Sequence, residues 1–360
     1  MKVDEIQIVK KIQETLKSIQ HPLLKKSIVD LNMIRHLEFQ SGVLSLKLTQ
    51  LSPNSIYNHQ VEDSVRDALA KISEITDLQI SLNWEVSGGK SAQNSSLPGV
   101  KNIVAVASGK GGVGKSTVAL NLALALSKSG AKVGVLDTDI YGPSLPTLMG
   151  LKNTPPLIDG EKKKMLPLEK FGIKTMSIGY LIKDEDAAVW RGPMIGRMVQ
   201  QFVQDVLWGD LDYLILDLPP GTGDIQLSLS QMLSITGAVI VTTPQDVALA
   251  DVIRSIAMFQ KVQIPILGMV ENMSYFSCPK CHEISHIFGQ GGGEKKAKNQ
   301  NIPFLGSIPL DNRICEASDL GKPILESDLE SEQAQKFLSL ASSVSDQVCL
   351  ANDRKIEIKL

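Results

Sequence analysis

Nine consecutive residues have the types and spacing of a loop that binds phosphate. In the sequence GKGGVGKST the glycines let successive backbone N–H groups turn inward around phosphate oxygens. Lys115 supplies a positive charge and the Ser116 hydroxyl is a magnesium ligand in this pattern. The predicted phosphate-binding residues are Gly109, Lys110, Gly111, Gly112, Val113, Gly114, Lys115, Ser116 and Thr117. We therefore expect the chain to bind a nucleoside triphosphate with Mg²⁺, although Lys110 needs a separate explanation.

Carboxylates follow two strand-like apolar runs, one ending at Asp137 and the other at Asp217. In open α/β sheets, ligands bind at the edge where parallel strands end. We expect Asp217 to hold Mg²⁺ through water, and the Gly221 N–H to sense the terminal phosphate. Asp139 is a candidate for orienting the attacking water or supporting the metal, because hydrolysis depends on positioning. A helix cap or turn carboxylate is the alternative for Asp139.

A second kind of chemistry is indicated by Cys278 and Cys281, which are separated by Pro-Lys. Two thiolates at this spacing can bind one metal or one edge of a cluster, and soft thiolates select zinc, copper(I) or iron-sulfur. Because one chain offers two ligands, a four-cysteine cluster needs two chains. Three other interpretations stay open: a zinc site completed by His282 or His286, a redox dithiol, and a c-type haem attachment site.

The elements around the phosphate loop can be predicted from its flanks. Residues 102–108 form an apolar run typical of a buried parallel strand, and residues 115–129 are helix formers that end at Gly130. Strand-like and helix-like segments then alternate, which predicts an α/β fold: a doubly wound, mostly parallel sheet of the P-loop NTPase kind. The loop then lies at a helix N-terminus, where N–H groups and the helix dipole favour an anion.

A glycine- and serine-rich stretch at 87–99 predicts a flexible linker that divides the chain. Before it, residues 1–86 show two helical patterns and two alternating strand patterns, which indicate a small α+β domain. That domain carries no catalytic constellation, so we expect it to dock or recruit a partner. After the linker we expect a P-loop NTPase domain at 100–350 and a C-terminal tail at 351–360.

Composition narrows the class of protein. The 360 residues include 37 basic and 39 acidic side chains without a strongly basic block, so we expect no nucleic-acid partner. No apolar run is long enough to span a membrane and the N-terminus lacks a signal-peptide core, so we expect no membrane partner and a cytoplasmic location. Four cysteines are too few for a disulfide framework. Cys315 and Cys349 are expected to be buried or incidental thiols.

Four motifs together resemble the Mrp/ApbC family. They are GKGGVGKST at 109–117, DTD at 137–139 continuing as IYGPSLP, WRGPM at 190–194 and DLPPGTGD at 217–224. Members of that family are deviant-Walker P-loop ATPases, related to MinD, ParA and nitrogenase iron protein, that carry iron-sulfur clusters. The similarity covers most of residues 100–345. The segment SIVDLNMIRHLEF at 27–39 resembles the small domain that precedes the ATPase in many members.

The resemblance implies roles that spacing alone does not supply. Lys110 would reach across a face-to-face homodimer to phosphates bound by the other subunit, and Cys278 and Cys281 would hold the cluster. Asn272 would contact adenine, with Pro309, Leu310 and Asp311 nearby. The family usually has glycine where this chain has His282, and its members often have Cys-Pro where this chain has Ser52-Pro53.

We therefore expect a homodimeric ATPase that uses ATP and Mg²⁺ and passes a four-iron four-sulfur cluster, bridged between subunits, to apo iron-sulfur proteins, working with cluster assembly factors. Lys110, Lys115 and Asp139 are the candidate catalytic residues. One alternative is a ParA- or MinD-like positioning ATPase without a cluster, and another is a zinc-containing ATP-dependent scaffold. The C-terminus, 352–360, alternates as a short strand, which disfavours a membrane-targeting helix.

Overall fold

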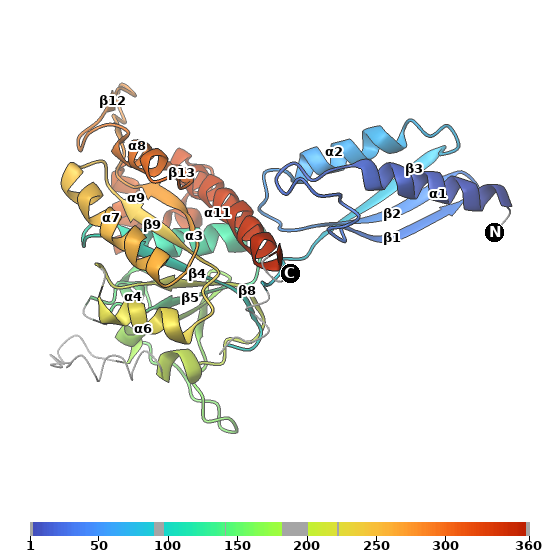
Figure 1. The fold of residues 1–360 in the computed structure, drawn as a ribbon. Helices are drawn as coiled ribbons and strands as arrows, with labels where there is room; N and C mark the ends of the chain where they lie inside the picture. The colour runs from blue at the N-terminus through green and yellow to red at the C-terminus, as the bar shows by residue number, and fades with distance from the viewer. Residues whose placement is uncertain (1–2, 90–96, 141, 182–200, 222, 358–360) are drawn as a thin grey trace. The chain divides into compact units, whose positions relative to one another are not determined.

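The structure is a computed structural model that describes residues 3–89, 97–140, 142–181, 201–221 and 223–357. The WRGPM motif at 190–194 lies outside these residues. The chain divides into two units, Met1–Ser87 and Gly88–Leu360, which we call the N-terminal and C-terminal units (Figure 1). None of the described helices is long and apolar enough to cross a membrane.

The N-terminal unit is a small α+β fold with a three-stranded sheet. Its elements are α1 (Val3–Ser18), β1 (Ile34–Gln40), β2 (Val43–Gln50), α2 (Asn58–Leu69) and β3 (Asp77–Trp84). Strand β2 is central, antiparallel to β1 and parallel to β3. The apolar faces of both helices pack on the sheet, with Ile12, Leu44 and Val65 fully buried. Strand β1 was not predicted, because its register shifts between Ile34 and His36 and so breaks the alternation of apolar residues.

The C-terminal unit alternates strands and helices. Its first half contains β4 (Val100–Ser108), α3 (Lys115–Lys128), β5 (Val133–Asp137), α4 (Leu145–Leu148), β6 (Leu168–Lys170), β7 (Ile173–Ser177), the 3₁₀ helix η2 (Ile178–Tyr180) and β8 (Leu211–Asp217). Its second half contains α6 (Asp224–Met232), β9 (Gly237–Thr242), α7 (Asp246–Lys261), β10 (Ile266–Glu271), β11 (Phe276–Ser277), β12 (Ile284–Ser285), α8 (Gly292–Asn299), β13 (Phe304–Ser307), α9 (Asn312–Asp319), α10 (Ile324–Ser327) and α11 (Glu332–Glu357).

Eight of these strands form one sheet in the order β13-β10-β9-β4-β8-β5-β7-β6, and only β6 is antiparallel to its neighbour. The chain moves from β4 toward β5 in one direction and from β8 through β9 and β10 to β13 in the other. Right-handed crossovers therefore place α3 on one face and α6, α7 and α8 on the other (Figure 1). The predicted doubly wound, mostly parallel sheet is confirmed, and its change of direction beside β4 marks the edge where ligands bind.

The core explains why the strands read as continuous apolar runs. Every residue of β5 and β9 is buried, and the inner strand β4 is buried from Asn102 to Ser108. Helix α3 is apolar around most of its surface because it is covered by the sheet on one side and by α11 on the other. Leu97, near the end of the predicted linker, is buried in the same core.

The C-terminal segment differs from its prediction. We expected a tail at 351–360 with an alternating strand, but α11 continues without a break to Glu357. Extending an existing helix adds one hydrogen bond for each residue that becomes ordered, which favours propagation over a short, unpaired strand. Asn352 is buried and its Nδ2 donates to Asn102 Oδ1 over 2.9 Å, so the helix end is fixed to β4. The predicted strand at 352–360 had disfavoured a membrane-targeting helix. Because residues 352–357 belong to α11 instead, this strand no longer counts against the ParA- or MinD-like positioning ATPase.

Candidate functional site

The phosphate loop connects β4 to α3 at the carboxyl edge of the sheet. The loop closes at Gly114, which has a φ of 79° and precedes the first residue of the helix, Lys115. A side chain at Gly114 would have a strained backbone and would overlap the Asn272 amide. At Gly109 an added Cβ would lie 2.5 Å from the backbone carbon of Asp251 in α7. The glycines therefore let the loop curl tightly between α7 and the end of β10.

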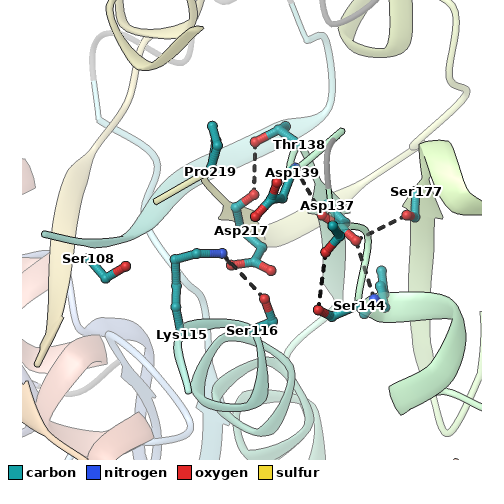
Figure 2. A network of polar contacts seen from close by, with 12 residues as sticks. Ser108, Lys115, Ser116, Asp137, Thr138, Asp139, Ser144, Ser177, Asp217 and Pro219 are labelled. Atoms are coloured by element: carbon teal, nitrogen blue, oxygen red, sulfur yellow. Dashed lines mark hydrogen bonds and ion pairs between the residues drawn. The ribbon is translucent and has the colours of Figure 1, made fainter. Parts of the chain in front are cut away.

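Lys115 forms an ion pair with Asp217, and only 7% and 3% of these side chains are exposed. The Lys115 Nζ also donates to Ser116 Oγ over 3.3 Å. Figure 2 shows the Lys115 side chain reaching toward both residues from the start of α3. The predicted phosphate-binding lysine and the two predicted magnesium ligands, Ser116 and Asp217, are thus brought together within one hydrogen-bonded cluster.

A second buried carboxylate, that of Asp137, lies beside this cluster. The register of β5 and β8 places Asp137 directly opposite Asp217. Asp137 accepts hydrogen bonds from the Asp139 backbone N at 3.0 Å and from Ser177 Oγ at 3.0 Å. Burial, together with the negative charge of Asp217, raises the pKa of Asp137 to about 7. Asp137 therefore shapes the loop that carries Asp139, and its protonated form is favoured beside Asp217.

The phosphate loop lines a pocket of about 240 Å³. Its walls are Ser108, Lys110, Gly111, Gly112, Gly114, Lys115, Ser116, Thr117, Asp139, Ser144, Leu148 and Pro220. The half-buried Asp139 thus lines the phosphate pocket, and its role in orienting the attacking water stays a prediction. Lys110 is exposed, and among the described residues no ion pair holds it. The Gly221 N–H donates to Ser108 O at 3.0 Å, and its contact with a terminal phosphate stays a prediction.

A neighbouring pocket of about 230 Å³ shares Gly114, Thr117 and Leu148 with the phosphate pocket. Its other walls are Asn272, Met273, Pro309, Leu310, Asp311, Ile314, Cys315, Ser318 and Asp319. The four residues expected near the base therefore line one cavity. The Asn272 Nδ2 donates to Val113 O over 2.8 Å, so this side chain also fixes the phosphate loop. Cys315 is an exposed thiol in this pocket, and nothing in its sequence context predicted that position.

Cys278 and Cys281 lie in the turn of a small hairpin formed by β11 and β12. The Cys278 N–H donates to Glu283 O over 3.0 Å, and the His282 N–H donates to Cys278 O over 2.8 Å. The backbone N–H groups of Cys281 and Lys280 donate to the Cys278 sulfur and lower the pKa of its thiol. Because Cys281 is exposed and Cys278 is partly exposed, the hairpin presents two accessible thiols, one of them favoured as a thiolate.

His282, where the Mrp/ApbC resemblance implies glycine, has a φ of 60°. Glycine reaches this left-handed region without a steric penalty, whereas a residue with a Cβ does not. The turn therefore keeps the glycine-type conformation despite the substitution.

The zinc alternative requires a third or fourth donor close to the two thiols. In the described part of the chain, no three His, Cys, Asp or Glu side chains are grouped closely enough to hold a metal ion. The His286 ring interacts through Nδ1 with Ser274 O at 3.4 Å. The described residues of one chain thus offer the cysteine pair and not a complete zinc site.

A doubly wound sheet, a glycine-rich phosphate loop between β4 and α3, and an aspartate at the end of the adjacent β8 define a P-loop NTPase. The chain belongs to the family described as NUBPL iron-transfer P-loop NTPase, whose model matches residues 99–345. Residues 10–82 match a second model, described as iron-sulfur cluster assembly protein. The family expected from the four motifs is confirmed.

The names of two similar proteins refer to iron-sulfur clusters. An iron-sulfur cluster carrier protein of Haemophilus influenzae is 43% identical over 94% of this chain and 91% of its own length. The iron-sulfur cluster transfer protein NUBPL of Dictyostelium discoideum is 50% identical over 71% of this chain and 80% of its own length.

Two solved structures are similar to part of this chain. A nucleotide-binding protein from Archaeoglobus fulgidus in complex with ADP is 39% identical, with a TM-score of 0.59, over 69% of this chain and 96% of that chain. The cell division ATPase MinD of Pyrococcus furiosus is 25% identical, with a TM-score of 0.52, over 68% of this chain and 98% of that chain.

Proposed function

We propose that the chain hydrolyses ATP as a homodimer and carries an iron-sulfur cluster, held by Cys278 and Cys281 of both subunits, to apo-proteins. One observation carries the proposal: a P-loop NTPase domain presents two accessible thiols, one stabilised as a thiolate, on a hairpin that follows strand β10 and Asn272. The names of the relatives from Haemophilus influenzae and Dictyostelium discoideum support the same cargo.

The two adjoining pockets support nucleotide binding. The phosphates would lie in the pocket around Lys115, and the base would lie in the pocket lined by Asn272 and Asp311. The complex of the Archaeoglobus fulgidus protein with ADP supports this assignment. Ser116 and Asp217 offer hard oxygen donors that suit Mg²⁺, and Lys115 contacts both of them. When bound, the metal would neutralise charge on the phosphate oxygens.

Hydrolysis transfers the terminal phosphoryl group of ATP to water, and the protein contributes mainly position and charge. Asp139 lines the phosphate pocket and is the candidate for orienting that water. Lys110 is exposed beside the same pocket, where its charge is available to a second subunit. We propose that it acts across the dimer, as an arginine finger does.

The cargo site requires two chains because each hairpin contributes two thiols. A four-iron four-sulfur cluster takes four thiolates, so two hairpins brought face to face supply the complete set. The cluster is cargo in this proposal, and it is taken up and released by exchange of thiolate ligands. The match of residues 10–82 to an iron-sulfur cluster assembly model supports a role for the N-terminal unit in contacting assembly factors or recipients.

Anaerobic reconstitution with iron and sulfide tests the cargo. We expect broad visible charge-transfer absorption in the wild type and in a Cys315→Ala, Cys349→Ala control, and its loss in a Cys278→Ala, Cys281→Ala variant. Stoichiometric zinc without this absorption would favour the scaffold alternative. ATP hydrolysis without uptake of iron or zinc would favour the ParA- or MinD-like positioning ATPase.

A further inference from the structure

The cysteine hairpin belongs to a segment whose two ends are held by one side chain. Glu271, at the end of β10, is only 1% exposed. Its Oε1 accepts a hydrogen bond from Ser274 Oγ over 2.5 Å, and its Oε2 accepts one from Gly293 N over 2.5 Å. The segment 275–292, which includes Cys278 and Cys281, is therefore flanked on both sides by residues that donate to one carboxylate, while Tyr275 O also accepts from Leu310 N.

The surroundings of Glu271 leave this carboxylate little room to move. Gly293 lies in the first turn of α8, where backbone N–H groups favour a negative charge. A Cβ at Gly293 would lie 2.9 Å from Oε2, so the helix start packs directly against the carboxylate. No ion pair of Glu271 with Lys or Arg occurs among the described residues, so hydrogen-bond donors are what hold its two oxygens. A shift of Glu271 would consequently move both ends of the segment.

The next residue along the chain reaches the nucleotide pocket. Asn272 donates from Nδ2 to Val113 O in the phosphate loop and lines the cavity assigned to the base. Its backbone N–H donates to Thr242 O over 2.8 Å, and Glu271 O accepts from Ile308 N over 2.9 Å. Two consecutive residues therefore connect the phosphate loop to both ends of the hairpin segment.

We propose that Glu271 is a positioning residue that couples nucleotide binding at Asn272 to the placement of Cys278 and Cys281. The inference rests on the proposed function, because it names the regulation of that nucleotide site and that cargo site. A ligand that changes the contact between Asn272 and the phosphate loop displaces the end of β10. Glu271 then transmits this displacement to the hairpin. By linkage, occupation of the thiols changes nucleotide affinity by the same factor.

Thiol labelling in the full chain, without metal, tests the coupling. In a Cys315→Ala background, which removes the thiol in the nucleotide pocket, the labelling rates of Cys278 and Cys281 by iodoacetamide are measured with and without ADP. We expect ADP to change these rates by about fivefold or more in the parent protein. In Glu271→Ala and in Ser274→Ala we expect the ratio to fall close to one, while calorimetry shows that ADP still binds.

Two further variants separate positioning from general stability. In Glu271→Gln the amide can accept from Gly293 N and donate to Ser274 Oγ, so we expect most of the ADP effect to return. Glu294→Ala is the matched control, because Glu294 is exposed one residue beyond Gly293 and should leave the effect unchanged. If Glu271→Ala does not fold, the effect of ADP on the labelling rates in Ser274→Ala tests the coupling instead.

The inference would be overturned if bound ADP left the labelling rates of Cys278 and Cys281 in the parent protein unchanged. An unchanged ADP effect in folded Glu271→Ala or Ser274→Ala would also overturn it. Because the labelling uses no cluster, its result is independent of the reconstitution: a coupled protein that takes up no iron would refute the proposed cargo and leave the coupling intact.

Discussion

Lys115 and Asp217 form a buried ion pair that joins the first turn of α3 to the end of β8. The register of the sheet also places Asp137 opposite Asp217, so a single lysine faces two buried carboxylates. Residues that the phosphate pattern assigns to nucleotide and metal binding thus also hold together two central elements of the fold. Substitutions here should therefore alter stability as well as affinity.

Lys115→Met should weaken ADP binding and destabilise the C-terminal unit by about 3–5 kcal/mol, because it leaves Asp217 buried without its partner. Hydrogen exchange of the β4 and β8 amides measures the loss of stability, and calorimetry measures the affinity. In Lys115→Met with Asp217→Asn, we expect part of the stability to return but not the ADP affinity. A double variant no more stable than the single one would show that the charge of Asp217 is not what destabilises the protein.

Lys110→Ala should reduce ATP turnover by roughly 10³-fold while ADP binding is retained, since an exposed charge that acts in the transition state contributes on that scale. Steady-state phosphate release measures turnover. Mixing Lys110→Ala chains with Ser116→Ala chains supplies the control. Each is expected to be inactive alone, and the mixture should regain activity because the second chain provides Lys110 to an intact site. Normal turnover in Lys110→Ala alone would remove the role across the dimer.

The phosphate loop, the strand-end carboxylates and the doubly wound sheet could be predicted because each depends on local patterns of residue type. Ser116, Asp139 and Asp217 come together because parallel strands end at one edge, which is a property of the fold class. Glu271 could not be found in this way. Its two partners lie 3 and 22 residues further along the chain, and an acidic residue at a strand end has no distinctive pattern.

Two other features also depended on packing rather than on pattern. The end of α11 alternates like a strand, and its fixed position comes from the contact of Asn352 with Asn102, 250 residues away. Asn272 was expected to contact adenine, and the structure shows that it also donates to Val113 O in the phosphate loop. Contacts over such separations are set by the tertiary fold, and a single sequence does not display them.

The four thiols should differ in their reaction with iodoacetamide as pH changes. Backbone donors lower the pKa of Cys278, so a larger share is thiolate near neutral pH and its labelling should begin at lower pH than that of an ordinary cysteine. Burial raises the pKa of Cys349 to about 12, so this thiol should stay protonated and unlabelled in the folded protein. Mass spectrometry of labelled peptides between pH 6 and 9 measures both. Equal rates at Cys278 and Cys349 would contradict the assignment.

His282→Gly should stabilise the cysteine hairpin by about 1–2 kcal/mol, because the residue has a left-handed backbone in which a Cβ is unfavourable. His282→Ala is the matched control, since it removes the ring and keeps the Cβ. Hydrogen exchange at the His282 amide, which donates to Cys278 O, reports the change. If the glycine and alanine variants exchange equally fast, backbone strain is not what limits the turn.

Native mass spectrometry of the anaerobically reconstituted protein tests the central claim most directly, because it counts chains, iron and sulfide in one species. We expect two chains with one four-iron four-sulfur cluster, and only cluster-free chains for the Cys278→Ala, Cys281→Ala variant. A single chain that retains a complete cluster or a zinc ion, or a dimer in which the double variant still holds the cluster, would contradict a cargo shared between the two hairpins.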